Sequence, residues 1–159
     1  MKKFLLPIVA TLLFVSCSSD DDNVYVPPVT PPASTNFLKA TIDGTEYTFD
    51  TFNVETETHT EPDFTYTDLH VTASISNDSS KEIVFSLEQN VVGSTDVIFF
   101  FYLLNNEEEF DTDHVGETFV HNVTVNADRR IAGTFSGALA RFDESGTVQI
   151  TNGSFDIKY

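Results

Sequence analysis

The amino-acid sequence predicts an all-β fold: a single antiparallel β-sandwich of about nine strands, with barrel-like closure as a variant of the same arrangement. From Phe37 onward, apolar and polar residues alternate over short segments, which is the period of a half-buried strand. Gly, Asn and Asp residues interrupt these segments at the intervals typical of sandwiches and barrels. No window sustains helical spacing together with capping residues.

Residues 1–16 are predicted to be a lipoprotein signal peptide. Lys2 and Lys3 supply a charged start, and Phe4 to Val15 form an apolar stretch of 12 residues that Pro7 interrupts. A helix needs about 20 residues to cross the hydrocarbon core of a bilayer, so this stretch is too short to span it. Its length and its charged flank are typical of a secretory leader.

The only cysteine, Cys17, directly follows this leader and is predicted to carry lipid. Phe14-Val15-Ser16-Cys17 resembles a bacterial lipobox, with Phe14 in place of the usual Leu. The alternative is a soluble secreted protein with one free thiol, an arrangement that exported proteins usually avoid. Buried acyl chains contribute about 0.8 kcal/mol per CH₂, and two or more chains hold a protein stably. We therefore expect a chain that is anchored to the membrane without spanning it.

Residues 17–36 are predicted to form the lipidated anchor and a tether. The residues after the cysteine form an acidic tract: Ser18, Ser19, Asp20, Asp21 and Asp22. This tract resembles that of Bacteroidetes-type outer-membrane lipoproteins, which implies export to the cell surface. A solvated spacer is the alternative explanation for these residues. Five of the six prolines lie at or before Pro32, and such a run favours a stiff polyproline II stalk.

The charge of the chain excludes a class of partners. It has 8 Lys and Arg against 25 Asp and Glu, and loss of the two leader lysines leaves 6 against 25, a formal charge of −19. Binding to nucleic acid or to anionic lipid headgroups depends on a basic surface. We expect no nucleic-acid partner, and attachment to the outer membrane through the acyl group on Cys17.

Residues 37–159 are predicted to form one antiparallel β domain that opens with a hairpin. Asp43-Gly44 favours a two-residue type I′ turn. Closing this turn pairs residues of one face: Ile42 with Thr45, Ala40 with Tyr47, and Leu38 with Phe49. At the other end of the chain, either Asn152-Gly153 is a hairpin turn or one continuous strand carries a bulge at Gly153.

Between these ends, the alternation of apolar residues predicts further strands, separated by polar turns at 77–81 and 127–130. The apolar stripes are Leu69, Val71, Ala73 and Ile75; Ile83, Phe85 and Leu87; Phe119, His121, Val123 and Val125; and Ile131, Phe135 and Leu139. Val97 to Leu104 is apolar on both faces, as in a central strand covered on each side. Gly133 and Gly137 leave gaps on the inward face, which either admit aromatic rings from a facing sheet or let the strand coil. We favour packing, because 13 of the 15 Phe residues lie in this domain.

Four segments of the domain have a recognisable turn-and-strand pattern: Phe37-Leu38-Lys39-Ala40-Thr41-Ile42-Asp43-Gly44, Ile131-Ala132-Gly133-Thr134-Phe135-Ser136-Gly137, Val148-Gln149-Ile150-Thr151-Asn152-Gly153-Ser154-Phe155 and the strand entry Val115-Gly116-Glu117-Thr118-Phe119. These segments look like those of small Bacteroidetes outer-membrane lipoproteins whose function is uncharacterised. The resemblance implies an antiparallel β-sandwich on a lipid anchor. It implies no catalytic residues.

The spacing of the four histidines does not predict a transition-metal site. His59, His70, His114 and His121 contain no i, i+2 or i, i+4 pair. We expect His70 to face solvent and His121 to be a core residue with satisfied hydrogen bonds.

The acidic segment 107–113 offers oxygen ligands of the kind that Ca²⁺ prefers, with Glu109, Asp111 and Asp113 as candidates. The segment lacks the glycine and the terminal Glu of an EF-hand loop. A solvated loop that keeps an acidic protein soluble is the interpretation we favour. We therefore expect no resident cofactor, with binding of Ca²⁺ by this segment as the alternative.

The sequence predicts no catalytic residues. Ser136 does not lie in a Gly-x-Ser-x-Gly elbow, and no pair of carboxylates stands out from so many. We expect a non-enzymatic binding or envelope-structural protein whose protein or glycan partner the sequence does not identify. The alternative is a surface glycan-binding accessory module for polysaccharide capture. The chain has no Trp for a sugar platform, which leaves Tyr47, Tyr66 and Tyr102 as candidates.

Overall fold

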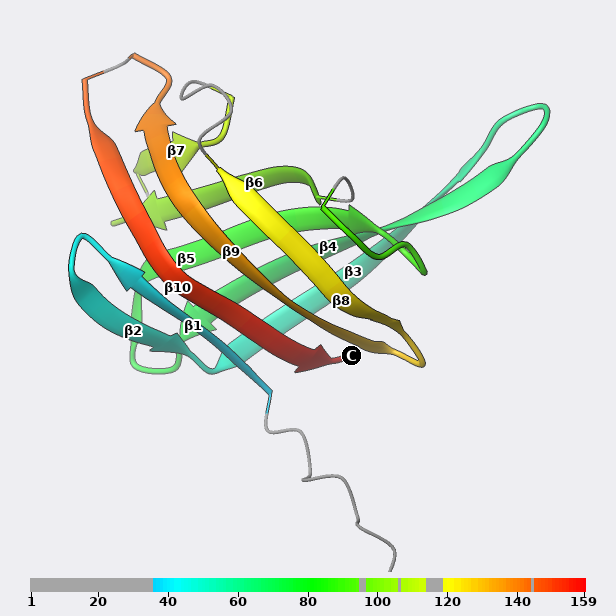
Figure 1. Cartoon of the computed structure of the whole chain (residues 1–159), viewed down its shortest axis with the longest axis horizontal. Coiled ribbons are helices and arrows are strands. Elements are labelled where there is room, and N and C mark those ends of the chain that lie inside the picture. Colours follow the sequence, from blue (N-terminus) through cyan, green and yellow to red (C-terminus); the bar gives the residue numbers. More distant parts are fainter. Residues whose placement is uncertain (1–35, 95–96, 106, 114–118, 144) are drawn as a thin grey trace, which may run out of the picture. The chain divides into compact units, whose positions relative to one another are not determined.

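The computed structural model describes residues 36–94, 97–105, 107–113, 119–143 and 145–159. The predicted leader, Cys17, the acidic tract and nearly all of the tether lie outside the described residues, as do His114 and the segment 115–118. Within the described ranges there are ten strands and no helix (Figure 1). Accordingly, none of these residues belongs to a helix long and apolar enough to cross a membrane.

All the strand pairs are antiparallel, as predicted. The strands are β1 (Phe37–Ile42), β2 (Thr45–Phe49), β3 (Thr51–Thr60), β4 (Thr65–Ile75), β5 (Asp78–Glu88), β6 (Val97–Leu104), β7 (Glu108–Asp111), β8 (Val120–Ala127), β9 (Arg130–Arg141) and β10 (Thr147–Lys158). They follow one another in the order β2-β1-β10-β9-β7-β6-β5-β4-β3, and β8 pairs with β9. The sheet curls so that β8, β9, β10, β1 and β2 lie across β3 to β6 (Figure 1). The predicted all-β antiparallel fold is confirmed. The strands form one sheet that curls into a half-barrel, and its end strands, β2 and β3, do not pair with each other.

Two of the observed strands were not expected from the sequence: β3, and β7, which occupies part of the segment expected to be an acidic loop. Phe110 accounts for β7. Its side chain is 6% exposed and packs 6.1 Å from the ring of Tyr102 on the neighbouring β6. Burial of this ring draws the acidic residues on either side of it into the sheet.

The first hairpin forms as predicted. Asp43 and Gly44 have φ values of 47° and 82°, which a type I′ turn requires at both positions. Ile42 faces Thr45, and Leu38 faces Phe49 across the ladder. The two alternatives for the C-terminal segment are resolved in favour of the bulge. The strand β10 is continuous, its register against β9 shifts between Ile150 and Gly153, and Asn152 takes a φ of 53°.

Aromatic rings fill the space between the two layers. Phe85 of β5 lies 5.1 Å from Phe155 of β10, and Phe100 of β6 lies 4.9 Å from Phe135 of β9, measured between ring centroids. All four side chains are at most 5% exposed. These contacts join the layers, because each couples a strand of one layer to a strand of the other.

The glycines make room for these rings, as expected, but the rings come from adjacent strands and not from a facing sheet. A Cβ on Gly133 would lie 2.8 Å from the ring of Phe155, its partner on β10. Reciprocally, a Cβ on Gly153 would lie 2.5 Å from the ring of Phe135, its partner on β9. Gly137 has a φ of 141° opposite the β10 bulge, so coiling of the strand contributes as well.

Two predictions about apolar stripes are wrong in part. A bulge between Val123 and Val125 shifts the alternation of β8, so that Asn126, 3% exposed, takes the inward place expected for Val125. On β6, Phe99 and Phe101 are only partly buried on the outer face, where a cover was expected. The sandwich has two layers, and the outer face of β6 has no third layer among the described strands.

Two sets of hydrogen bonds outside the strand ladders connect segments of the curled sheet. Asp50 joins β2 to β3, its backbone N–H donates to the carbonyl of Ser74 (3.1 Å), and its carboxylate accepts from the N–H of Ser76 (2.8 Å). On the other side, the backbones of Gly93 and Val123 bond reciprocally at 2.9 and 2.8 Å.

Candidate functional site

A two-stranded ribbon, residues 58–67, projects beyond the rest of the sheet, and we call it the arm (Figure 1). The ladder between β3 and β4 runs without interruption from the pair Thr51–Ser74 to the pair Thr60–Thr65. In contrast, β4 pairs with β5 only from Asp68 onward. The arm therefore has no sheet neighbour among the described strands.

Three rings stack along the outer face of the arm. The ring of Tyr66 lies 4.8 Å from that of His59, at an interplanar angle of 21°, and 5.8 Å from that of Phe64, at 26°. Phe64, at the tip, is 61% exposed. On the opposite face, the hydroxyls of Thr58 and Thr67 are hydrogen-bonded at 3.1 Å. Cross-strand contacts of this kind are what stabilises a ribbon that has no core of its own.

Two histidines and two carboxylates lie at the base of the arm. The Nε2 atom of His59 is 3.3 Å from Asp68 Oδ2 and 4.0 Å from Glu57 Oε2. From the other side, the Nε2 atom of His70 is 3.4 Å from Glu57 Oε2. Asp68 is 8% exposed, and its Oδ1 atom is buried without a hydrogen-bond partner.

The cluster was not predicted, because its members lie on two different strands. The spacing of the histidines in the sequence contains no pair typical of a metal site, whereas the hairpin register places Glu57 opposite Asp68. Since side chains two apart in a strand share a face, His59 and His70 lie on that face as well. His70 lies on the outer face, as expected, and is paired there with Glu57. A hairpin turn centred on Pro62-Asp63 sets this register, so that turn is the sequence signal that predicts the cluster.

The line of rings continues from the arm across the outer face of the sheet. The ring of His70 lies 6.1 Å from that of Phe99, which in turn lies 4.9 Å from that of Phe101. Beneath them, Ser86 is fully buried, and its hydroxyl has no hydrogen-bond partner. This face is acidic as well as aromatic. Residues 51–75 contain no Lys or Arg, and their acidic residues are Glu55, Glu57, Glu61, Asp63 and Asp68.

The structure does not bring the candidate Ca²⁺ ligands together as a site. Glu109 is exposed, whereas Asp111 is 8% exposed and accepts a hydrogen bond from the backbone N–H of Asp113 (2.9 Å). Across the described ranges, no group of three His, Cys, Asp or Glu side chains is placed to hold a metal ion. A concavity of about 230 Å³ beside Glu109 is also lined by Arg141, whose Nε lies 3.5 Å from Asp143. The Arg141 guanidinium therefore already supplies a positive charge beside these carboxylates.

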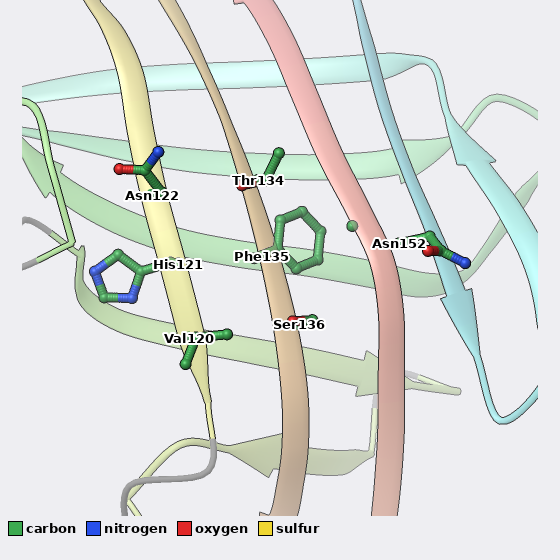
Figure 2. Close-up of a pocket in the computed structure, with 8 residues that line it drawn as sticks. Val120, His121, Asn122, Thr134, Phe135, Ser136 and Asn152 are labelled. Atoms are coloured by element: carbon green, nitrogen blue, oxygen red, sulfur yellow. The ribbon is translucent and has the colours of Figure 1, made fainter.

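The second candidate site is an open groove of about 370 Å³ over β8, β9 and β10 (Figure 2). Its polar lining consists of amides and hydroxyls without a carboxylate or an ammonium group: Asn122, Thr134, Ser136 and Asn152. Val120, which is 60% exposed, adds an apolar wall, and Phe135 and Gly153 lie at the base. The ring of His121 projects on the far side of β8 from β9 (Figure 2). His121 is partly buried against Phe119, at 6.4 Å between ring centroids.

The three tyrosines considered for sugar binding have different environments. Tyr102 is 3% exposed, and its burial, together with nearby Tyr47 and acidic groups, raises the pKa of its hydroxyl to about 12. Tyr47 is partly buried, and the Lys81 ammonium lies 5.6 Å from its ring centroid. Tyr66 is the one in the arm. Ser136 lies on a regular strand and not on the sharp turn that exposes a nucleophile in hydrolases.

Comparison of the chain with protein-family models, with curated proteins and with solved structures finds no match. No residue role is carried over from another protein, and the arm and the groove are assigned from their own geometry.

Proposed function

We propose that the chain is a lipid-anchored outer-membrane lipoprotein that displays a non-enzymatic binding domain at the cell surface. The anchor would be Cys17, and the acidic tract 18–22 would direct export. The residues from Ser18 to Asn36, if fully extended at about 3.1 Å each, hold the domain up to roughly 60 Å from the lipid. A domain at that distance can meet partners beyond the headgroups.

The arm is the single observation that carries the binding role. A two-stranded ribbon is marginally stable in water on its own, and one that projects from the sheet adds little to the core. Yet this one has stacked rings, an exposed Phe64 at its tip and a cluster of carboxylates at its base. Exposed aromatic rings beside charged groups are typical of contact surfaces.

The proposed anchor is tested by replacing its sulfur. We expect mass spectrometry of the wild-type protein to show acyl groups on Cys17, and the protein to sediment with the outer membrane. Cys17→Ser removes the acceptor, so this variant should leave the membrane fraction. Ser19→Ala keeps the lipobox and should remain bound. An unmodified Cys17 in a wild-type protein that is free of membranes would contradict the proposal.

Display at the surface needs a separate measurement. Protease added to intact cells should digest the β domain of the wild-type protein, because an outward-facing domain is accessible without lysis. A periplasmic protein used as a control should resist under the same conditions. Digestion only after the outer membrane is opened would place the domain on the periplasmic face.

Glycan capture is the second candidate, and the groove in Figure 2 favours it. Neutral amide and hydroxyl groups bind sugar hydroxyls without the desolvation cost of a charge, and Val120 offers an apolar contact. We expect a glycan array to show ligands whose binding is lost in Asn122→Ala combined with Thr134→Val. Thr48→Val, an exposed change on β2 outside the groove, is the matched control. An array without ligands would reject this candidate.

A further inference from the structure

β3 is a long and regular edge strand, because among the described strands it pairs with β4 alone. It has ten residues, lies at the end of the sheet order, and pairs with β4 in ten consecutive pairs without a bulge. It contains no Pro and no Lys, which are residues that proteins use to block an edge. At the opposite end of the order, β2 has only five residues, and β8 is bulged and bridged to Gly93.

The hydrogen-bond alternation shows which backbone groups of β3 face the open edge. At the tip, the N–H of Glu61 donates to the carbonyl of Phe64 at 2.9 Å. Hydrogen-bonded pairs alternate along an antiparallel ladder, so the odd-numbered residues of β3 bond to β4. The even-numbered residues present their N–H and C=O groups to the free edge: Phe52, Val54, Thr56, Thr58 and Thr60.

The side chains beside this edge define what could pair with it. Glu55 and Glu57 are exposed on the outer face. Phe52 and Val54 are partly buried on the inner face, where they pack against the core. A strand added to β3 would place alternate residues over the carboxylates and the intervening residues over the apolar pair.

The charge of the edge selects among partners. Residues 51–75 carry five acidic groups and no Lys or Arg, and the buried Oδ1 of Asp68 lacks a hydrogen-bond donor. A second copy of β3 would bring its own Glu55 and Glu57 to the same edge, and like charges across a ladder are destabilising. A basic segment gains from the same arrangement.

We propose that β3 binds an extended basic segment of a partner polypeptide as an added strand, with Lys or Arg over Glu55 and Glu57 and apolar residues over Phe52 and Val54. Backbone hydrogen bonds supply affinity in this mode of recognition, and the alternating side chains supply specificity. This inference rests on the proposed binding role and names the class of partner. It does not depend on the anchor at Cys17.

The test uses the full-length protein in detergent and a labelled ten-residue peptide that alternates Lys with Val and Thr, with binding measured by fluorescence anisotropy. Thr56→Pro removes an N–H that faces the open edge and leaves the ladder to β4 intact, since an edge strand tolerates Pro there. We expect this variant to bind about tenfold more weakly, the equivalent of roughly 1.4 kcal/mol. Thr56→Val keeps the N–H and should bind like the wild type.

A second pair of measurements tests the charge without altering the backbone. Glu55→Gln combined with Glu57→Gln should weaken binding and reduce its dependence on salt, because two of the paired charges are gone. A peptide with Glu in place of Lys should not bind. Equal binding by Thr56→Pro, or by the Glu peptide, would overturn the proposal.

Two further outcomes would also overturn the inference. The first is binding of a glycan, and not of the peptide, that is lost in Thr56→Pro. The second is a wild-type protein that sediments as a dimer without peptide, where Thr56→Pro is a monomer. Neither outcome changes the lipidation of Cys17 or the membrane fractionation, so failure of the inference and failure of the anchor are distinguishable.

Discussion

At Gly133 and Gly153, the lack of a side chain lets an aromatic ring of the adjacent strand pack against the backbone. Each glycine faces a Phe on the adjacent strand, and the ring lies where a Cβ would be. The arrangement is reciprocal, because β9 supplies one glycine and one ring, and β10 supplies the others. Backbone atoms close the remaining space, since a Cβ on Gly133 would lie 2.6 Å from the carbonyl oxygen of Asn122.

We predict that Gly133→Ala and Gly153→Ala each lower the free energy of unfolding by about 1–3 kcal/mol, because the added methyl forces the ring or the backbone to move. Gly146→Ala is the matched control. Its Cβ would have ordinary contacts, 3.6 Å from Arg141 and 3.8 Å from Phe110, and its effect should stay within about 0.5 kcal/mol. Chemical denaturation measures all three. Equal effects at the three positions would contradict the close packing described above.

Asp78 gives a residue-scale prediction about pH. A hydrogen bond from the Ser80 hydroxyl, with others from Lys81 and the Ser80 backbone, lowers the pKa of this carboxyl from 3.8 to about 2. Because the folded pKa is depressed, the stabilisation is present above pH 3.8 and is lost as the pH falls toward 2. We expect the stability difference between the wild type and Asp78→Asn to shrink over that window.

Ser80→Ala removes the largest cause of the lowered pKa of Asp78 and keeps the hydrogen bonds from Lys81 and from the Ser80 backbone. Loss of its hydroxyl should raise the pKa of the Asp78 carboxyl, as read from an NMR titration, while Lys81 remains in place. An unchanged titration in Ser80→Ala would show that the hydroxyl does not determine the pKa.

At the scale of elements, local sequence predicted two of the hairpins, whereas most of the turn expected at 77–81 is strand, since β5 begins at Asp78. Asp43-Gly44 and the 127–130 turn both form, and Asp128 and Arg129 have φ values of 54° and 57°. Turn chemistry and alternation act within a few residues, so both were visible in the chain. The bulges of β8 and β10 are set by partner strands, and their effects on Val125 and Asn152 required the tertiary pairing.

The candidate site was less accessible to sequence reasoning for the same reason. His59 and Asp68 are brought together by the register of a hairpin, and the groove by the pairing of the consecutive strands β8, β9 and β10. For the acidic segment 107–113, the prediction of a loop was wrong in part. Its carboxylates suggested a loop, whereas burial of Phe110 made it a strand.

The arm should respond locally to loss of its central ring. Tyr66→Ala removes both stacking contacts, to His59 and to Phe64, from a ribbon that has few others. We predict faster hydrogen exchange at the arm amides, with a change in global stability below about 1 kcal/mol. Thr65→Ala, an exposed arm position, is the control. Global unfolding of Tyr66→Ala would show that the arm is part of the core unit.

At the scale of the whole domain, charge opposes compaction. Residues 37–159 contain 6 Lys and Arg against 22 Asp and Glu, a net charge of −16. Self-repulsion of this size destabilises a folded chain, and salt screens it over a Debye length of about 10 Å at 0.1 M. We predict that the melting temperature rises between about 10 mM and about 0.5 M NaCl. A fall in melting temperature over this range would mean that ion pairs such as Arg130–Asp156, at 2.7 Å, outweigh the repulsion.

The position of β10 has a consequence for the order of events in biogenesis. This strand fills the slot between β1 and β9, and it is the last of the ten to be synthesised. Since the chain is synthesised from its amino terminus, the β1–β2 hairpin and β9 exist before the strand that joins them. The described sheet can therefore be completed only after residues 147–158 have been made.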